Sequence, residues 1–301
     1  MLISQTARAN LALSLAAFFW GTTFIAQREA MDFLKPMAYG GSRFTLGALC
    51  LLPLALARGR KLLSSPAADP GRLIRSWLTG AFISGLFVFV GISFQQYGLL
   101  WTTAGKGGFI TCLYVILVPI SLRCLGHKIV AGEAMGAVLA LAGLYFLSLT
   151  AGDLSLSKGD GLVLIGAFIW AGHVLALGWL SPRTDSLMLG FGQALVCGLL
   201  ALLSTVILGQ WPTWGDLAAS WLLILWGGVL SVALGFTLQV IGQKHARPAP
   251  AAIIMQMESV VAAIAGWLYL EEVITGRMFL GMALMLAGML ISQLWPILTR
   301  K

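Results

Sequence analysis

Two charged side chains, Arg43 and Glu258, stand well inside long apolar stretches of this chain. An ionised group in hydrocarbon costs several kcal/mol, so such a residue usually faces a cavity or a partner. A guanidinium can hold a carboxylate through two parallel hydrogen bonds, and a carboxyl group can contact an amine or exchange a proton. The pattern is equally compatible with a structural ion pair between the two residues, with a neutral Glu258 hydrogen-bonded between helices, or with a peripheral place for Arg43.

Tryptophan and polar side chains recur on matching helical faces. Trp20, Thr23 and Gln27 share one stripe, because residues three, four and seven positions apart lie on one face of a helix. Shifted by 150 positions, Trp170 and His173 fall on the equivalent stripe. Both tryptophans lie about halfway along their apolar stretches, whereas interfacial anchors lie at the ends. We therefore predict a cavity lined by both faces, with His173 either titrating or bridging helices by a hydrogen bond.

A second set of polar residues accompanies small residues. Gln95 and Gln239 occupy equivalent places in glycine-rich stretches, a pattern that favours close helix packing and also suits a substrate path. Thr111 and Tyr114 share a face of another helix.

One further stretch poses a geometric conflict. Gln256 and Ser259 share a helical face, but Gln256 and Glu258 lie about 200° apart around a helix. These two side chains cannot both point straight into one cavity.

These arguments give thirteen candidate residues of a substrate-binding pathway, with Glu258 and His173 also as candidate coupling groups: Trp20, Thr23, Gln27, Arg43, Gln95, Thr111, Tyr114, Trp170, His173, Gln239, Gln256, Glu258 and Ser259. The four cysteines show no CxxC spacing, so we predict no metal site. The sequence contains no HExxH, P-loop or GxSxG motif, so we expect neither a cofactor nor an enzyme.

Composition supplies the elements that must position these residues. The chain has 301 residues, 59% hydrophobic and 10% charged, with a mean hydropathy of +0.91. A soluble domain does not need so much apolar surface, and runs of about 20 residues cross a bilayer. The sequence predicts an all-α integral membrane protein with ten transmembrane helices. They are expected at about 10–30, 36–57, 75–98, 104–125, 132–150, 160–181, 186–208, 217–240, 249–270 and 276–296.

The second half repeats the pattern of the first. Besides the match of the two mid-span tryptophans, Trp77 falls on Trp221 and Gln95 on Gln239 at an offset of 144. Each half holds five spans, an odd number, so the second half must enter from the opposite side of the bilayer. We predict two inverted five-helix repeats, residues 1–150 and 151–301, of the kind that alternates access about a midplane site.

The distribution of positive charge predicts the orientation. With the N-terminus in the cytoplasm, thirteen Lys and Arg side chains fall on the inner side and five on the outer side. This bias favours a multi-pass protein with both termini cytoplasmic. It also accounts for the net charge of +8 without a nucleic-acid partner.

Three stretches resemble a known family. The chain reads FFWGTTF in the first span, GGSRFTLGALCLLPL in the second and APAAIIMQMESVVAAIAGW in the ninth. Their order and spacing resemble the drug/metabolite transporter superfamily, specifically its EamA-type bacterial members, over essentially the whole chain. One departure is Ser259 after the acidic residue of span nine, where the family usually has proline.

The resemblance implies a secondary carrier of the bacterial inner membrane that exports amino acids and related small metabolites. The mid-span tryptophans suggest aromatic or apolar substrates. Efflux of cationic drugs is the alternative, because a carboxylate such as Glu258 among aromatic rings would suit a cation. The expected partners are a small-molecule substrate and the lipid bilayer. The driving ion stays open, as does the choice between monomer and homodimer.

Overall fold

The protein is described by a computed structural model over residues 4–66, 69–102, 104–148, 157–269 and 273–298. The predicted division between residues 150 and 151 lies outside these ranges. The elements are α1 (Gln5–Ala30), α2 (Pro36–Leu63), α3 (Pro70–Gly98), α4 (Ala104–Cys112), α5 (Tyr114–Cys124), α6 (Ala131–Ser148), α7 (Lys158–Leu180), α8 (Ser186–Ile207), α9 (Trp214–Trp226), the π-helix η1 (Gly227–Phe236), α10 (Thr237–Gln243), α11 (Pro248–Met255), α12 (Glu258–Tyr269) and α13 (Gly276–Leu298).

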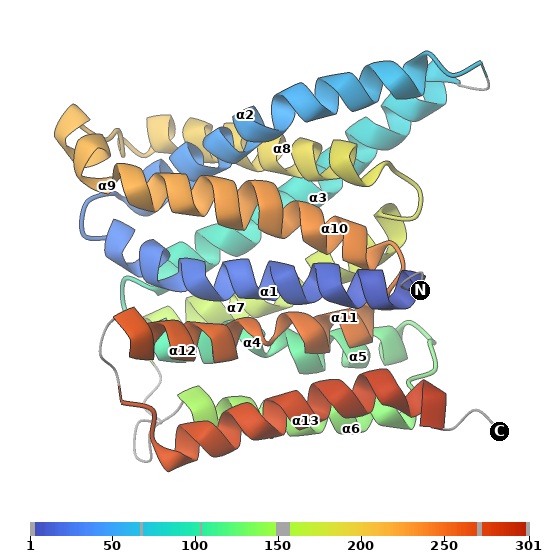
Figure 1. The fold of residues 1–301 in the computed structure, drawn as a ribbon. Helices are drawn as coiled ribbons and strands as arrows, with labels where there is room; N and C mark the ends of the chain where they lie inside the picture. Colours follow the sequence, from blue (N-terminus) through green and yellow to red (C-terminus); the bar gives the residue numbers. More distant parts are fainter. Residues whose placement is uncertain (1–3, 67–68, 103, 149–156, 270–272, 299–301) are drawn as a thin grey trace.

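The helices make ten apolar spans. In the described ranges, nine helical segments are long and apolar enough to cross a membrane, and Ala131–Leu147 is a shorter apolar helix. No β-strand occurs in these ranges. The all-α prediction of ten transmembrane helices is therefore confirmed. The first helix begins and the last helix ends at the same end of the bundle (Figure 1), as an even number of crossings requires.

Local sequence signals set the helix starts. Ser157 accepts a hydrogen bond from the Asp160 amide at 3.1 Å, and the Asp160 carboxylate accepts one from the Ser157 amide at 2.8 Å. Thr213 and Asp216 make the same reciprocal pair at the start of α9. Such capping boxes satisfy amides that have no partner within the helix. Proline in the first turn begins α2, α3 and α11.

Each half packs chiefly against the other. The helix α1 contacts η1, α10 and α12, while its repeat counterpart α7 contacts α3. The helices α2 and α8 pair with each other, as do α6 and α13 (Figure 1). Each helix of the first half contacts the second half, and its counterpart in the second half contacts the equivalent part of the first half. This reciprocal packing is the arrangement that an inverted repeat produces. A space at the centre of the bundle is consequently walled by both halves.

Three spans are interrupted, although the sequence predicted them as continuous helices over 104–125, 217–240 and 249–270. Span four breaks at Leu113 and span nine at Gln256 and Met257. At both breaks the chain makes a tighter turn, in which the Leu113 amide bonds the Ile110 carbonyl at 3.2 Å and the Met257 amide bonds the Ile254 carbonyl at 3.0 Å. Span eight widens into η1. Such irregular backbone is tolerated at membrane depth where protein or a cavity surrounds it.

Glycines allow α6 and α13 to touch backbone to backbone. A Cβ added to Gly281 would lie 2.6 Å from the Gly143 carbonyl oxygen, and one on Gly288 would lie 2.6 Å from that of Gly136. The sequence left open whether these glycines pack internally or join two protomers. The structure shows that they pack internally, as small residues do between membrane helices.

Replacing Gly281 by alanine is expected to lower the free energy of unfolding by about 1–3 kcal/mol, because the new methyl group overpacks a backbone contact. The thermal unfolding midpoint in detergent measures this loss. Gly161→Ala in α7 is the matched control, since a Cβ there meets nothing within 4 Å. Equal midpoints for the two variants would contradict the tight crossing.

Candidate functional site

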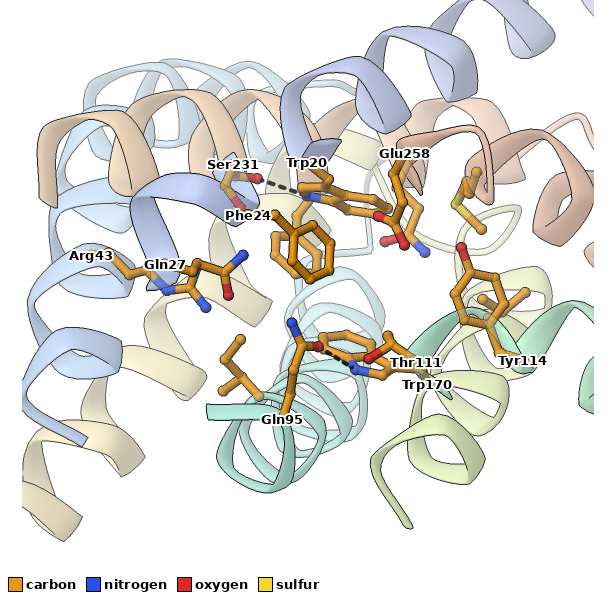
Figure 2. Close-up of a pocket in the computed structure, with 15 residues that line it drawn as sticks. Trp20, Phe24, Gln27, Arg43, Gln95, Thr111, Tyr114, Trp170, Ser231 and Glu258 are labelled. Atoms are coloured by element: carbon orange, nitrogen blue, oxygen red, sulfur yellow. Dashed lines mark hydrogen bonds between the residues drawn. The ribbon is translucent and has the colours of Figure 1, made fainter. Parts of the chain in front are cut away.

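A cavity lies at the centre of the bundle, between the two halves (Figure 2). Its free space for the centres of water-sized molecules is about 60 Å³, enough for several waters. It is lined by Trp20, Phe24, Gln27, Arg43, Ile92, Gln95, Thr111, Tyr114, Trp170, Val174, Ser231, Phe236, Gln239, Met255 and Glu258.

Each mid-span tryptophan lies against a glycine of the opposite half. A Cβ on Gly235 would lie 2.6 Å from Trp20 Nε1, and a Cβ on Gly91 would lie 3.0 Å from the Trp170 ring. The ring of Phe236 lies between the tryptophans, with centroids 5.0 Å from Trp20 and 6.2 Å from Trp170. The glycines therefore leave room for an aromatic wall that joins the two halves.

The indole N–H groups fix the orientation of this wall. Trp20 Nε1 donates to the Ser231 carbonyl at 3.2 Å, and Trp170 Nε1 donates to Gln95 Oε1 at 3.0 Å (Figure 2). The acceptor for Trp20 belongs to η1, and π-helical segments often occur at functional sites. Both rings present apolar faces to the cavity while their polar atoms are satisfied by the opposite half.

Arg43 supplies a buried positive charge at one end of the cavity. Its side chain is 1% exposed, and its guanidinium carbon lies 5.0 Å from the ring centre of Tyr39 and 5.1 Å from that of Phe44. These aromatic faces attract the cation. In the part of the chain that the structure describes, neither Nε nor Nη2 has a hydrogen-bond partner. A buried charge with free donors is costly unless an anion joins it.

Glu258 supplies a carboxyl group toward the other end of the cavity (Figure 2). It begins α12, directly after the break in span nine. The Cys112 thiol donates a hydrogen bond to Glu258 Oε1 at 3.4 Å, and Tyr114 lines the same cavity. Cys112 and Tyr114 flank the break in span four. The two interrupted spans thus meet at this acid.

The structure decides between the alternatives for Arg43. No ion pair joins it to Glu258 in the described residues, since the two side chains lie at opposite ends of the cavity (Figure 2). Nor does Arg43 lie at the periphery, because its side chain is almost fully buried.

Nine of the thirteen candidates line the cavity, and four lie outside its lining. Thr23 donates to the Phe19 carbonyl of its own helix. Gln256 donates to the Ala140 carbonyl of α6 at 2.9 Å, and Ser259 lies 3.0 Å from Cys112 Sγ. Of Gln256 and Glu258, only the latter faces the cavity, in keeping with their opposed directions.

His173, the fourth of these, is buried beside the cavity wall. Its Nε2 lies 3.1 Å from Gln193 Oε1 of α8, and its ring packs edge-on against Trp170 and Phe236. The geometry is that of a hydrogen-bonded bridge between α7 and α8.

Six lining residues were not predicted: Phe24, Ile92, Val174, Ser231, Phe236 and Met255. Phe24 lies four positions after Trp20 and therefore on the same helical face, so the spacing could have predicted it. Ser231 and Phe236 belong to the π-helix η1. No feature of the sequence predicted a π-helix at this place. No group of three or more His, Cys, Asp or Glu side chains in the described ranges is placed to hold a metal ion.

Both halves of the chain match one known family. The model of the EamA-like transporter family matches residues 7–149 and 157–294. The chain belongs to this family. A protein of Archaeoglobus fulgidus named as an uncharacterized transporter is 29% identical over 290 residues, covering 95% of this chain and 86% of its own. The uncharacterized transporter YoaV of Bacillus subtilis is 24% identical, covering 95% of this chain and 96% of its own.

A solved structure supports the same fold for this EamA-like transporter. One crystal structure superposes with a TM-score of 0.77 at 21% identity, covering 97% of this chain and 99% of the other. At that identity the likeness shows the fold alone. Family membership shows that the chain is a transporter. The class of its substrate must be inferred from the chemistry of the cavity.

A double-mutant cycle tests the bridge of His173. Replacing either His173 or Gln193 by leucine leaves a buried polar group unpaired, so each single change should cost about 1–3 kcal/mol. The double replacement should cost less than the sum, by about 0.5–3 kcal/mol. Thermal unfolding of the four proteins in detergent measures the coupling. Strictly additive losses would contradict the bridge.

Proposed function

We propose that this EamA-like transporter is a secondary carrier that exports amino acids and related small metabolites from the cytoplasm. The single observation that carries the proposal is the buried side chain of Arg43, which lines the central cavity and whose Nε and Nη2 have no hydrogen-bond partner in the described residues. A substrate carboxylate would satisfy those donors through two hydrogen bonds. We infer a transport role rather than catalysis, with neither metal nor cofactor.

The remaining lining fits the rest of such a substrate. Trp20, Trp170 and Phe236 offer apolar faces to a side chain, which favours aromatic or apolar amino acids. Glu258 would receive the amine or exchange a proton during the cycle, and Gln95, Gln239 and the hydroxyl groups of Thr111 and Tyr114 would supply further hydrogen bonds. Gln27 would bind beside Arg43.

The proposed mechanism is alternating access. The halves 1–150 and 151–301 would rock against each other about the aromatic wall, opening the cavity to one side at a time. In the proposed orientation both termini are cytoplasmic in a bacterial inner membrane. The uneven distribution of Lys and Arg between the two ends of the bundle supports this orientation.

Export of cationic drugs is a second candidate function. The observation that favours it is the Glu258 carboxyl group in a cavity walled by aromatic rings, an arrangement that attracts organic cations. The buried guanidinium argues against it, because a bound cation would share the cavity with an unneutralised positive charge.

Replacing Arg43 by glutamine should reduce amino-acid counterflow in proteoliposomes on the order of 100-fold, because the substrate carboxylate loses a buried ionic partner. The empty protein should at the same time keep or raise its thermal unfolding midpoint, because an unpaired buried charge is removed. Arg43→Lys should retain part of the transport.

Arg28→Gln is the matched control, since Arg28 is exposed and pairs with Asp32 at 3.2 Å. It should leave counterflow unchanged. Wild-type liposomes in which no preloaded amino acid accelerates uptake would contradict the proposed substrate class. Normal counterflow by Arg43→Gln would contradict the role of the guanidinium.

Replacing Glu258 by glutamine should abolish the response of counterflow to an imposed proton gradient while amino-acid exchange continues, because the amide cannot exchange a proton. The exposed Glu29 gives the control, Glu29→Gln. An unchanged gradient response would remove Glu258 as a coupling group. If Glu258→Gln instead abolished efflux of an organic cation and left amino-acid flux intact, the second function would be favoured.

A further inference from the structure

An open groove with a high positive charge lies outside the central cavity, at the end of the bundle where α1 begins. It is formed by Arg72, Arg75 and Ser76 of α3, Trp179 of α7 and Arg183 of the following turn, and is called here the arginine groove. Its free space for water-sized molecules is about 240 Å³, several times that of the central cavity. Nothing in the proposed transport cycle uses these residues.

Part of the arginine groove is held in place before any ligand binds. The Arg183 guanidinium lies 4.8 Å from the ring centre of Trp179 and donates to the Trp179 carbonyl. The Arg183 carbonyl accepts a hydrogen bond from Ser76 at 3.3 Å, which ties the turn to α3. A stacked and hydrogen-bonded guanidinium loses little freedom when it binds an anion.

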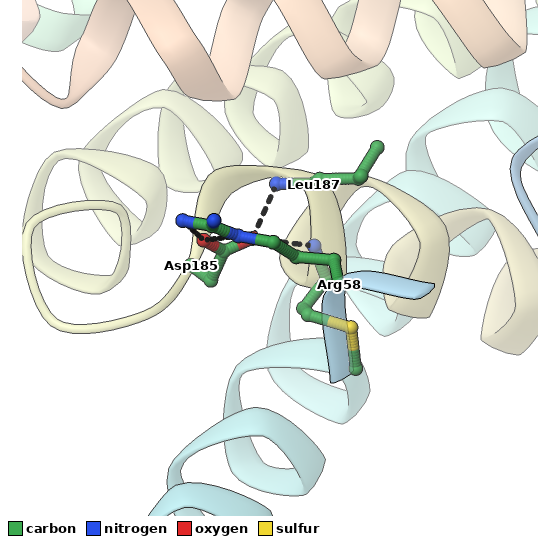
Figure 3. A network of polar contacts seen from close by, with 4 residues as sticks. Arg58, Asp185 and Leu187 are labelled. Atoms are coloured by element: carbon green, nitrogen blue, oxygen red, sulfur yellow. Dashed lines mark hydrogen bonds and ion pairs between the residues drawn. The ribbon is translucent and has the colours of Figure 1, made fainter. Parts of the chain in front are cut away.

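The neighbouring carboxylates are already occupied. Asp185 accepts hydrogen bonds from Arg58 at 2.8 Å and from the Leu187 and Met188 amides at the start of α8 (Figure 3). Asp69 accepts the Arg72 amide at the start of α3.

The guanidinium groups of the groove are consequently free for another anion. Within the described ranges, no ion pair joins Arg72, Arg75 or Arg183 to an acid. Three positive charges without an acidic partner favour a strongly anionic ligand.

Apolar stripes run from the arginine groove along both helices that form it. On α3, the exposed Leu78 and Phe82 follow Arg75 at three and seven positions, so they share its face. On α7, the exposed Phe168 and Ile165 lie on the face of Trp179. In a membrane-spanning chain these exposed faces meet acyl chains. A ligand with an anionic head and apolar tails therefore matches the groove and its surroundings together.

We propose that the arginine groove binds the phosphate of an anionic phospholipid, whose acyl chains lie along α3 and α7. Juxtamembrane arginines attract anionic lipid head groups electrostatically. The concave shape of the groove would in addition hold the head group in one place. A zwitterionic phospholipid fits less well, because its own ammonium group would meet three guanidiniums.

Native mass spectrometry of the full chain in detergent tests the site, with phosphatidylglycerol and phosphatidylcholine of identical acyl chains added in equal amounts. The wild type is expected to bind phosphatidylglycerol preferentially. The double variant R72Q/R75Q should weaken that binding on the order of 30-fold, from the loss of two lipid-facing charges. Both side chains are exposed, so the variant should fold, and its unfolding midpoint checks this.

The matched control is R60Q/K61Q, which removes two exposed charges near the C-terminal end of α2, outside the groove. It should change the affinity by no more than about twofold, since exposed charges off the site are screened. Equal losses in both double variants, or equal binding of phosphatidylcholine, would overturn the proposal. Full displacement of the lipid by millimolar inorganic phosphate would also overturn it, by showing a site for a free anion.

Discussion

The contact of each mid-span tryptophan with a glycine of the opposite half is the interaction on which the central cavity depends. Trp20 and Trp170 could not approach Gly235 and Gly91 if those positions carried a Cβ. Their indole N–H groups are then satisfied by the same opposing helices. Because the arrangement is repeated by the inverted symmetry, one structural solution builds both sides of the wall. The two rings thus line the cavity, and each contacts the half of the chain opposite its own.

The two charged side chains that line the cavity are not arranged to neutralise each other. Arg43 and Glu258 would neutralise each other if they were adjacent, yet the structure holds them at opposite ends. The Glu258 carboxyl group has the Cys112 thiol as a hydrogen-bond partner, whereas Arg43 has mainly aromatic faces around it. An unpaired buried guanidinium lowers the stability of the empty protein. Natural proteins retain a destabilising group where function needs it. The unpaired guanidinium of Arg43 would therefore both destabilise the empty protein and form the proposed carboxylate site.

Sequence periodicity could predict the spans, their repetition and much of the lining, because apolar length and helical faces are local properties. Other parts of the lining could not be predicted from local sequence, as the following residues show. Thr23 and Phe24 are neighbours on one helix, and the way α1 packs against η1 and α12, which its own sequence does not specify, decides that Phe24 lines the cavity. Ser231 and Phe236 line it through a π-helix that local sequence does not specify. The bond from His173 to Gln193 joins two helices, and no spacing within either helix could reveal it.

Competition between amino acids and their amides in wild-type proteoliposomes measures whether the Arg43 guanidinium selects the substrate. The free acid and its amide share side chain and amine and differ only in the carboxylate proposed to meet Arg43. Free acids are expected to suppress uptake of a labelled amino acid, and the matching amides are expected to compete on the order of 100-fold more weakly. Equal competition by acids and amides would show that the buried guanidinium does not select the substrate.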